Sequence, residues 1–177
     1  MENQTHTEHE HQEGQEHHHH HHHATAAFMV NHLIANQGVL NVKLHQFHWY
    51  IQGRDFYRLH EKFEELYNEV NQYYDQFAER MLAIGEKPYS TLAEYLEHAF
   101  ISEKPYETKM SSNEMVETLV SDYRTIRDVT IKAIELAVKE GDFVTEDMLK
   151  EYKANLDQTV WMLQAYLGND ALEGEEE

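Results

Sequence analysis

The sequence predicts an all-α protein, a four-helix bundle with one short extra helix, from three observations. Only 2 prolines and 7 glycines occur among 177 residues, a composition that favours long helices over short strands. Apolar residues recur at spacings of three, four and seven in four long segments, which is the pattern of an amphipathic helix. Glycine and proline separate these segments. About 150 residues follow the histidine-rich start, enough for one domain with its own core.

The first two predicted helices are separated by Gly53. The first covers residues 24–52, and Asp55 is positioned to cap the second, which Gly85 and Pro88 end. The apolar face of the first consists of Leu33, Leu40, Leu44, Phe47 and Ile51. The apolar face of the second consists of Phe56, Leu59, Phe63, Leu66, Val70, Tyr73, Phe77, Met81 and Ile84.

Two capping boxes mark the next elements, since Ser or Thr followed three residues later by Glu satisfies the free N–H groups at a helix start. Thr91 with Glu94 predicts a short helix that ends near Phe100. Ser111 with Glu114 opens the third long helix. Its apolar face consists of Val116, Leu119, Tyr123, Ile126, Thr130, Ala133 and Ala137.

The third long helix runs to Gly141, and Thr145 is expected to open the fourth, which Gly168 ends. The apolar face of the fourth consists of Met148, Tyr152, Leu156, Val160, Leu163 and Leu167. The chain is therefore divided into a histidine-rich tail at residues 1–23, a helical bundle at 24–170 and an acidic tail at 171–177.

The charge and composition exclude several classes of function. The net charge is −19, from 33 acidic and 14 basic residues, which opposes tight binding to nucleic-acid phosphates. No cysteine is present, so a bound metal must rely on His, Asp and Glu ligands. No apolar run approaches the roughly 20 residues of a membrane span, and no secretory signal opens the chain. A cytoplasmic location is expected.

The first 23 residues contain 10 histidines, of which 7 are consecutive from His17 to His23. Such a segment has no apolar surface to bury and is expected to be disordered. Two interpretations remain open. One is a purification tag, and the other is a natural tail that collects or buffers metal and loses affinity below about pH 6.5.

Polar residues follow one face of the second helix, beside its apolar stripe, namely His60, Glu64, Asn71, Asp75 and Glu79. A solvated surface is the ordinary explanation for such a face. His48, however, lies just upstream among aromatic neighbours, and Asp75 and Glu79 are one turn apart and could hold one cation together. The sequence thus allows a metal site on this face.

The separation of His60 and Asp75 along the helix decides whether one chain could hold such a site alone. His60 and Asp75 are 15 residues apart, about 22 Å on a straight helix, whereas metal–ligand bonds are about 2 Å long. The two residues cannot bind the same metal within one chain. If two copies of the helix cross antiparallel about a two-fold axis near Asn68, His60 of one copy meets Asp75 and Glu79 of the other.

The segment LHQFHWYIQGRDFYRLHEKFEELYNEVNQYYDQFAERMLAIG, from Leu44 to Gly85, resembles the signature region of the Dps family, the miniferritins also called DNA-protection-during-starvation proteins. It combines the His-Trp pair, the glycine, Phe-x-x-Leu-His and Asp-x-x-x-Glu at the family's spacing. The resemblance extends from Phe28 to Leu172. It implies a ferritin-like bundle that assembles from two-fold dimers into a hollow dodecamer.

The resemblance also implies a function. Ferrous iron would be oxidised, with hydrogen peroxide as the oxidant, at sites between two-fold-related subunits, and stored as a ferric mineral. The implied ligands are His48 and His60 from one subunit with Asp75 and Glu79 from the other, and Glu64 as an auxiliary ligand. Trp49 either quenches stray oxidising equivalents or packs in the core. The alternatives are a DNA-compacting protein and a metal buffer acting through the tail.

Two features depart from the family. The acidic positions of its iron-entry pore align with Val138, Phe143 and Asp147, of which only Asp147 is acidic; Glu140, Asp142 or Glu146 could substitute, or could belong to an ordinary capped turn. The amino-terminal tail also lacks the Lys and Arg residues of DNA-binding members. DNA binding is not expected at neutral pH, although a protonated histidine tail would attract DNA in acid.

Overall fold

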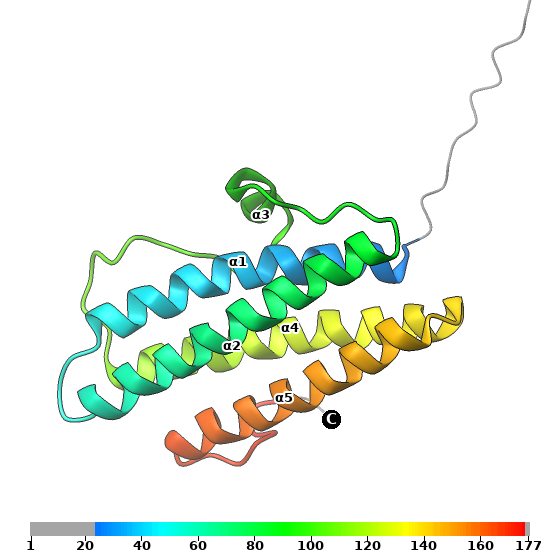
Figure 1. Cartoon of the computed structure of the whole chain (residues 1–177). Coiled ribbons are helices and arrows are strands. Elements are labelled where there is room, and N and C mark those ends of the chain that lie inside the picture. Colours follow the sequence, from blue (N-terminus) through cyan, green and yellow to red (C-terminus); the bar gives the residue numbers. More distant parts are fainter. Residues whose placement is uncertain (1–23, 176–177) are drawn as a thin grey trace, which may run out of the picture.

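The computed structural model describes residues 24–175, which form five helices and no strand. The four long helices are α1 (Ala26–Tyr50), α2 (Phe56–Ala83), α4 (Ser112–Glu140) and α5 (Phe143–Tyr166), and the short one is α3 (Leu92–His98). The long helices lie side by side, with α1 against α2 and α4, and α4 against α5 (Figure 1). Helix α3 packs on the outside of α1. The predicted four-helix bundle with a short extra helix is confirmed.

The core lies between the four long helices and contains most of the predicted apolar residues, together with unpredicted ones such as Val30, Ile34, Met115 and Leu149; Phe56, Tyr73, Met148 and Leu167 are only partly buried. Among its largest fully buried side chains are Phe63, Phe77, Leu33, Leu40, Leu44, Met81, Leu119 and Ile126. Ile84 was assigned to the face of α2 but is 37% exposed, and it stands just after the last helical residue, Ala83.

Most predicted helix ends are correct. Ser111 and Glu114 form the full capping box of α4, and Gly141 ends that helix in the left-handed conformation, with φ of 68°. At α3, Thr91 accepts a hydrogen bond from the Glu94 N–H, but the Glu94 carboxylate accepts from the Ser90 N–H and the Thr91 hydroxyl. The box of α3 is therefore only half formed.

One predicted cap is wrong and another is only half correct. Asp55 stands at the start of α2, but its side chain makes no capping bond and accepts instead from the Tyr166 hydroxyl at 2.9 Å. Thr145 does not open α5, which begins two residues earlier and is capped by Asp142. Asp142 accepts from the N–H and hydroxyl of Thr145 and from Arg80. Although burial opposes it, these bonds lower the pKa of Asp142.

The carboxyl-terminal segment lies against α4 as far as the structure describes it. Arg124 donates to the carbonyls of Ala171 and Glu173, and Glu175 pairs with Arg124 at 3.1 Å and with Arg127. The predicted histidine-rich tail at residues 1–23 lies outside the described residues. Within residues 24–175, no helix combines the length and apolarity needed to cross a membrane.

Gly38 sets how closely α3 approaches α1. A Cβ at this position would lie 2.6 Å from Cδ2 of Tyr95, whose hydroxyl is bonded to Tyr74 and to the Tyr89 carbonyl. Alanine normally stabilises a helix relative to glycine by about 0.5–1 kcal/mol. Here Gly38→Ala is expected to destabilise the protein by about 1–3 kcal/mol through overpacking, measured by guanidinium unfolding.

The double variant Gly38→Ala/Tyr95→Ala, compared with Tyr95→Ala alone, serves as the control for that prediction. The clashing atoms are Cδ2 and Cγ of Tyr95, so the overpacking penalty at Gly38 should disappear in a Tyr95→Ala background, which lacks both. A single Gly38→Ala variant more stable than the original chain would contradict the close contact.

Candidate metal centre

His48 and His60 are brought together by the turn between α1 and α2. His48 lies in the last turn of α1 and His60 near the start of α2. Carbonyl groups in the last turn of a helix lack partners within the helix, and the His48 carbonyl accepts a hydrogen bond from Nδ1 of His60 at 2.7 Å. In return, Nδ1 of His48 donates to the His60 carbonyl at 2.6 Å. The two histidines thus fix each other.

These bonds determine which ring nitrogen can bind a metal. A carbonyl oxygen only accepts, so Nδ1 is the donor in both rings, and in the neutral form of each imidazole the lone pair lies on Nε2. That is the form in which histidine ligates metals, with the second nitrogen held by a neighbouring group. The rings are stacked, with centroids 3.6 Å apart and planes 10° from parallel. The single chain therefore holds the two imidazole rings in one fixed mutual orientation.

Aromatic packing supports the histidine pair. His48 is only 8% exposed. Phe56 stacks on His60 with centroids 4.9 Å apart. The pair is therefore packed between a buried position on α1 and an aromatic ring at the start of α2.

Asp75 and Glu79 do not join the pair within the chain. Both are exposed on the same face of α2, one turn apart, and α2 is continuous over 28 residues. Asp75 therefore lies about 22 Å along the helix from His60. Among residues 24–175, no three His, Asp or Glu side chains of one chain are grouped as a metal site would require. The single chain therefore keeps the histidine pair and the predicted carboxylate ligands apart.

Glu64 lies on the histidine side of α2, one turn after His60, and is exposed. It accepts a hydrogen bond from the Tyr67 hydroxyl at 3.3 Å. Burial, followed by the charge and hydrogen bond of Glu64, raises the pKa of Tyr67. The phenol therefore keeps its proton at neutral pH and acts as the donor.

Tyr67 lies against His48 and His45 lies against Tyr67, and neither was predicted from the sequence. The Tyr67 ring stacks on His45, with centroids 3.8 Å apart, and meets the edge of His48 at 5.4 Å. His45 is oriented by its own Nδ1, which donates to the Asn41 carbonyl at 2.7 Å. The available signal was its position three residues before His48, on the same face of α1.

Trp49 does not pack in the core, so that interpretation is wrong for the single chain. Its side chain is 68% exposed, and its ring meets His45 edge-on with centroids 5.6 Å apart. An exposed tryptophan beside the histidine pair is available to a second copy of the chain or to solvent.

The positions aligned with the iron-entry pore lie at the turn between α4 and α5. Val138, Phe143 and Asp147 are all exposed there. The possible acidic substitutes are engaged elsewhere. Glu140 accepts from the Ala26 N–H at 2.9 Å, Asp142 caps α5, and Glu146 pairs with Lys150 at 2.6 Å. These contacts favour the capped-turn interpretation.

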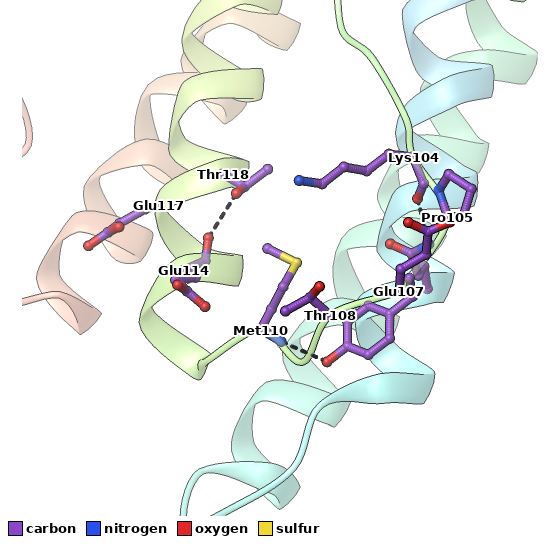
Figure 2. A pocket seen from close by; sticks show the side chains of 10 residues that line it. Lys104, Pro105, Glu107, Thr108, Met110, Glu114, Glu117 and Thr118 are labelled. Atoms are coloured by element: carbon purple, nitrogen blue, oxygen red, sulfur yellow. Dashed lines mark hydrogen bonds between the residues drawn. The ribbon is translucent and has the colours of Figure 1, made fainter.

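A groove between α4 and the segment before it offers no second metal site. Figure 2 shows the Lys104 side chain extending toward Thr118, and the Met110 N–H bonded to the hydroxyl of Tyr106. The acidic groups of the groove, Glu107, Glu114 and Glu117, have no histidine beside them among its lining residues. None of the predicted ligands lines this groove.

The helical bundle and the paired histidines define a ferritin-like protein. The family described as ferritin-like domain matches residues 29–172. The DNA protection during starvation protein of Listeria innocua is 46% identical over 144 residues, which cover 81% of this chain and 92% of that protein. The solved structure of Dps from Listeria innocua aligns at 45% identity with a TM-score of 0.83, covering 85% and 99% of the two chains. The chain belongs to the Dps family.

One of the matching structures is a histidine variant of the Listeria innocua protein. In it, glycine replaces two histidines that lie 12 positions apart, the same separation as His48 and His60. It aligns at 43% identity with a TM-score of 0.83, over 85% of this chain and 99% of that one.

Proposed function

We propose that the protein oxidises ferrous iron at centres shared between two copies of the chain and stores the ferric product. Each centre takes His48 and His60 from one copy and Asp75 and Glu79 from the other, with Glu64 as an auxiliary ligand. The observation that carries the proposal is the reciprocal bonding of the two histidines, which leaves both Nε2 atoms free to bind metal. Family membership supplies the iron chemistry.

The ring geometry indicates two metal positions in each centre. The imidazole planes are nearly parallel and their centroids are 3.6 Å apart, so lone pairs in those planes do not converge on one ion at a bond length of about 2 Å. Each histidine therefore serves its own iron position. Asp75 and Glu79 of the second copy would complete both positions.

The ligand set suits the oxidation. Imidazole nitrogens accept ferrous iron, and carboxylate oxygens favour the harder ferric product. Two ferrous ions each give one electron to hydrogen peroxide, which takes up two protons and leaves as two waters. Because the two irons of one centre supply both electrons, hydrogen peroxide is reduced fully to water and no hydroxyl radical is released. Trp49, exposed nearby, is proposed to take up stray oxidising equivalents.

We extend the proposal to a hollow dodecamer in which the mineral is held. The chain exposes large apolar side chains at the end of the bundle near the turn between α4 and α5, and these are Leu82, Val138, Phe143 and Val144. Contiguous exposed apolar residues are typical of protein interfaces. Contacts between subunits at this end would bury them.

Deletion of residues 1–23 separates this function from metal buffering by the histidine tail. The deletion leaves Thr25, which caps α1. Peroxide-driven oxidation of added ferrous iron, followed by absorbance of the ferric product, is expected to keep its wild-type rate within about twofold, because all proposed ligands remain. Loss of oxidation in the deleted protein, with normal rates in His48→Ala, would instead favour the buffer.

The name of the Listeria relative refers to DNA protection, which raises DNA binding as a second function. Removal of iron and peroxide protects DNA without contact, and a net charge of −19 opposes contact. In a gel-shift assay at pH 7.5 and physiological salt, we expect no retardation of duplex DNA. Salt-sensitive retardation under those conditions would contradict the charge argument.

A further inference from the structure

Tyr67 contacts two of the proposed ligands, His48 through its ring and Glu64 through its hydroxyl. Its ring stacks on His45, with planes 18° from parallel, and stands at 88° to the ring of His48. Its hydroxyl reaches Glu64. Tyr67 is thus tied to two residues of the proposed ligand set without belonging to it.

Glu64 needs such a partner if it is to act as a ligand. It is exposed, and a glutamate side chain that is free to rotate loses conformational entropy when it is fixed on a metal. It stands four residues after His60 on the same face of α2, so it can reach the position that His60 serves. A hydrogen bond from the Tyr67 hydroxyl keeps the Glu64 carboxylate on the His60 side of α2 before metal binds.

We propose that Tyr67 is a positioning residue, which holds Glu64 beside His60 and thereby raises the affinity of that position for ferrous iron. The inference rests on the proposed function. Tyr67 acts through its hydroxyl, and the stacking on His45 keeps the ring in place to deliver it. Ordinary aromatic packing, the competing explanation, would need the ring and not the hydroxyl.

Tyr67→Phe separates these explanations because it removes only the hydroxyl. In the full chain, the ferrous iron concentration giving half the maximal rate of peroxide-driven oxidation should rise about three- to tenfold, the range of one hydrogen bond. The maximal rate should change less than twofold. Tyr57→Phe is the matched control, since Tyr57 lies on α2 and is 82% exposed, and it should behave as wild type.

A second set of variants tests whether Tyr67 acts through Glu64. If it does, Tyr67→Phe should have no further effect in a Glu64→Ala background, because the oxygen that accepts from the Tyr67 hydroxyl is already gone. Additive effects of the two substitutions would overturn the inference. So would a wild-type iron dependence in Tyr67→Phe.

Failure of the inference can be told from failure of the proposed function. His60→Ala and Asp75→Ala test the centre itself, and the histidine tail is identical in every variant. If both oxidise iron normally, the shared centre is wrong and the inference falls with it. If both lose activity while Tyr67→Phe matches wild type, only the positioning role of Tyr67 is wrong.

Discussion

Asp75→Ala should reduce the rate of peroxide-driven ferrous oxidation by at least about 100-fold. Loss of groups that merely support metal ligands already costs about 10–100-fold, and Asp75 is proposed to bind iron directly. The side chain is exposed, so the substitution should change the free energy of unfolding by less than about 0.5 kcal/mol. Stopped-flow absorbance of the ferric product measures the rate, and guanidinium unfolding measures the stability.

Glu61→Ala is the control for Asp75→Ala. Glu61 is an exposed acid on α2, next to His60 in sequence but on another face of the helix. It should retain the wild-type rate. Equal losses in the two variants would indicate a general effect of negative charge on iron attraction, and the assignment of Asp75 as a ligand would then be wrong.

The second large effect is expected at a buried ion pair between α1 and α4. Lys43 Nζ lies 2.6 Å from Asp122 Oδ2, and the two side chains are 10% and 11% exposed. Lys43→Met keeps the aliphatic stem but leaves the Asp122 carboxylate buried without its partner. Loss of one partner of a buried pair destabilises by about 3–5 kcal/mol, which guanidinium unfolding at pH 7 would measure.

The stability lost in Lys43→Met should depend on pH. Burial raises the pKa of Asp122, and Lys43 opposes that rise, so the variant should have a still higher pKa. A carboxyl group with a raised pKa binds protons more tightly when folded, and stability then falls as pH rises through that pKa. The loss in free energy of unfolding caused by Lys43→Met should therefore be largest at neutral pH and should shrink as Asp122 becomes protonated in acid.

Lys43→Met/Asp122→Leu should recover most of the lost stability, because neither charge remains to be buried. A deficit that stays constant between neutral pH and the acid range, or that persists in the double variant, would show that Lys43 acts through packing rather than charge.

The sequence predicted the helices well because their signals are local. Apolar spacing fixes which face is buried, and Ser111 with Glu114 forms the predicted cap within one turn. Asp55 takes the predicted cap position without the predicted bond, and Thr145 was assigned wrongly, both for a tertiary reason. Tyr166, 111 residues away, engages Asp55, and Arg80 helps to hold Asp142 as the cap of α5. No local pattern contains those partners.

The site was only partly predictable. Spacing on α2 showed that His60 and Asp75 cannot meet in one chain, and the continuous helix bears out that separation. The reciprocal bonds between His48 and His60 could not be foreseen, since they depend on how the turn after α1 is folded. Tyr67 was missed because helical spacing says which residues share a face but not which rings stack.

Sharing of each centre between two copies can be tested by mixing subunits. His48→Ala/His60→Ala chains and Asp75→Ala/Glu79→Ala chains are co-expressed, and the mixed assemblies are isolated. Each variant alone should be inactive. In a mixed dimer one centre lacks all four ligands and the other is complete, so random pairing should restore about a quarter of wild-type oxidation per subunit. Mixed assemblies that form but remain as inactive as the separate variants would contradict a centre built from two chains.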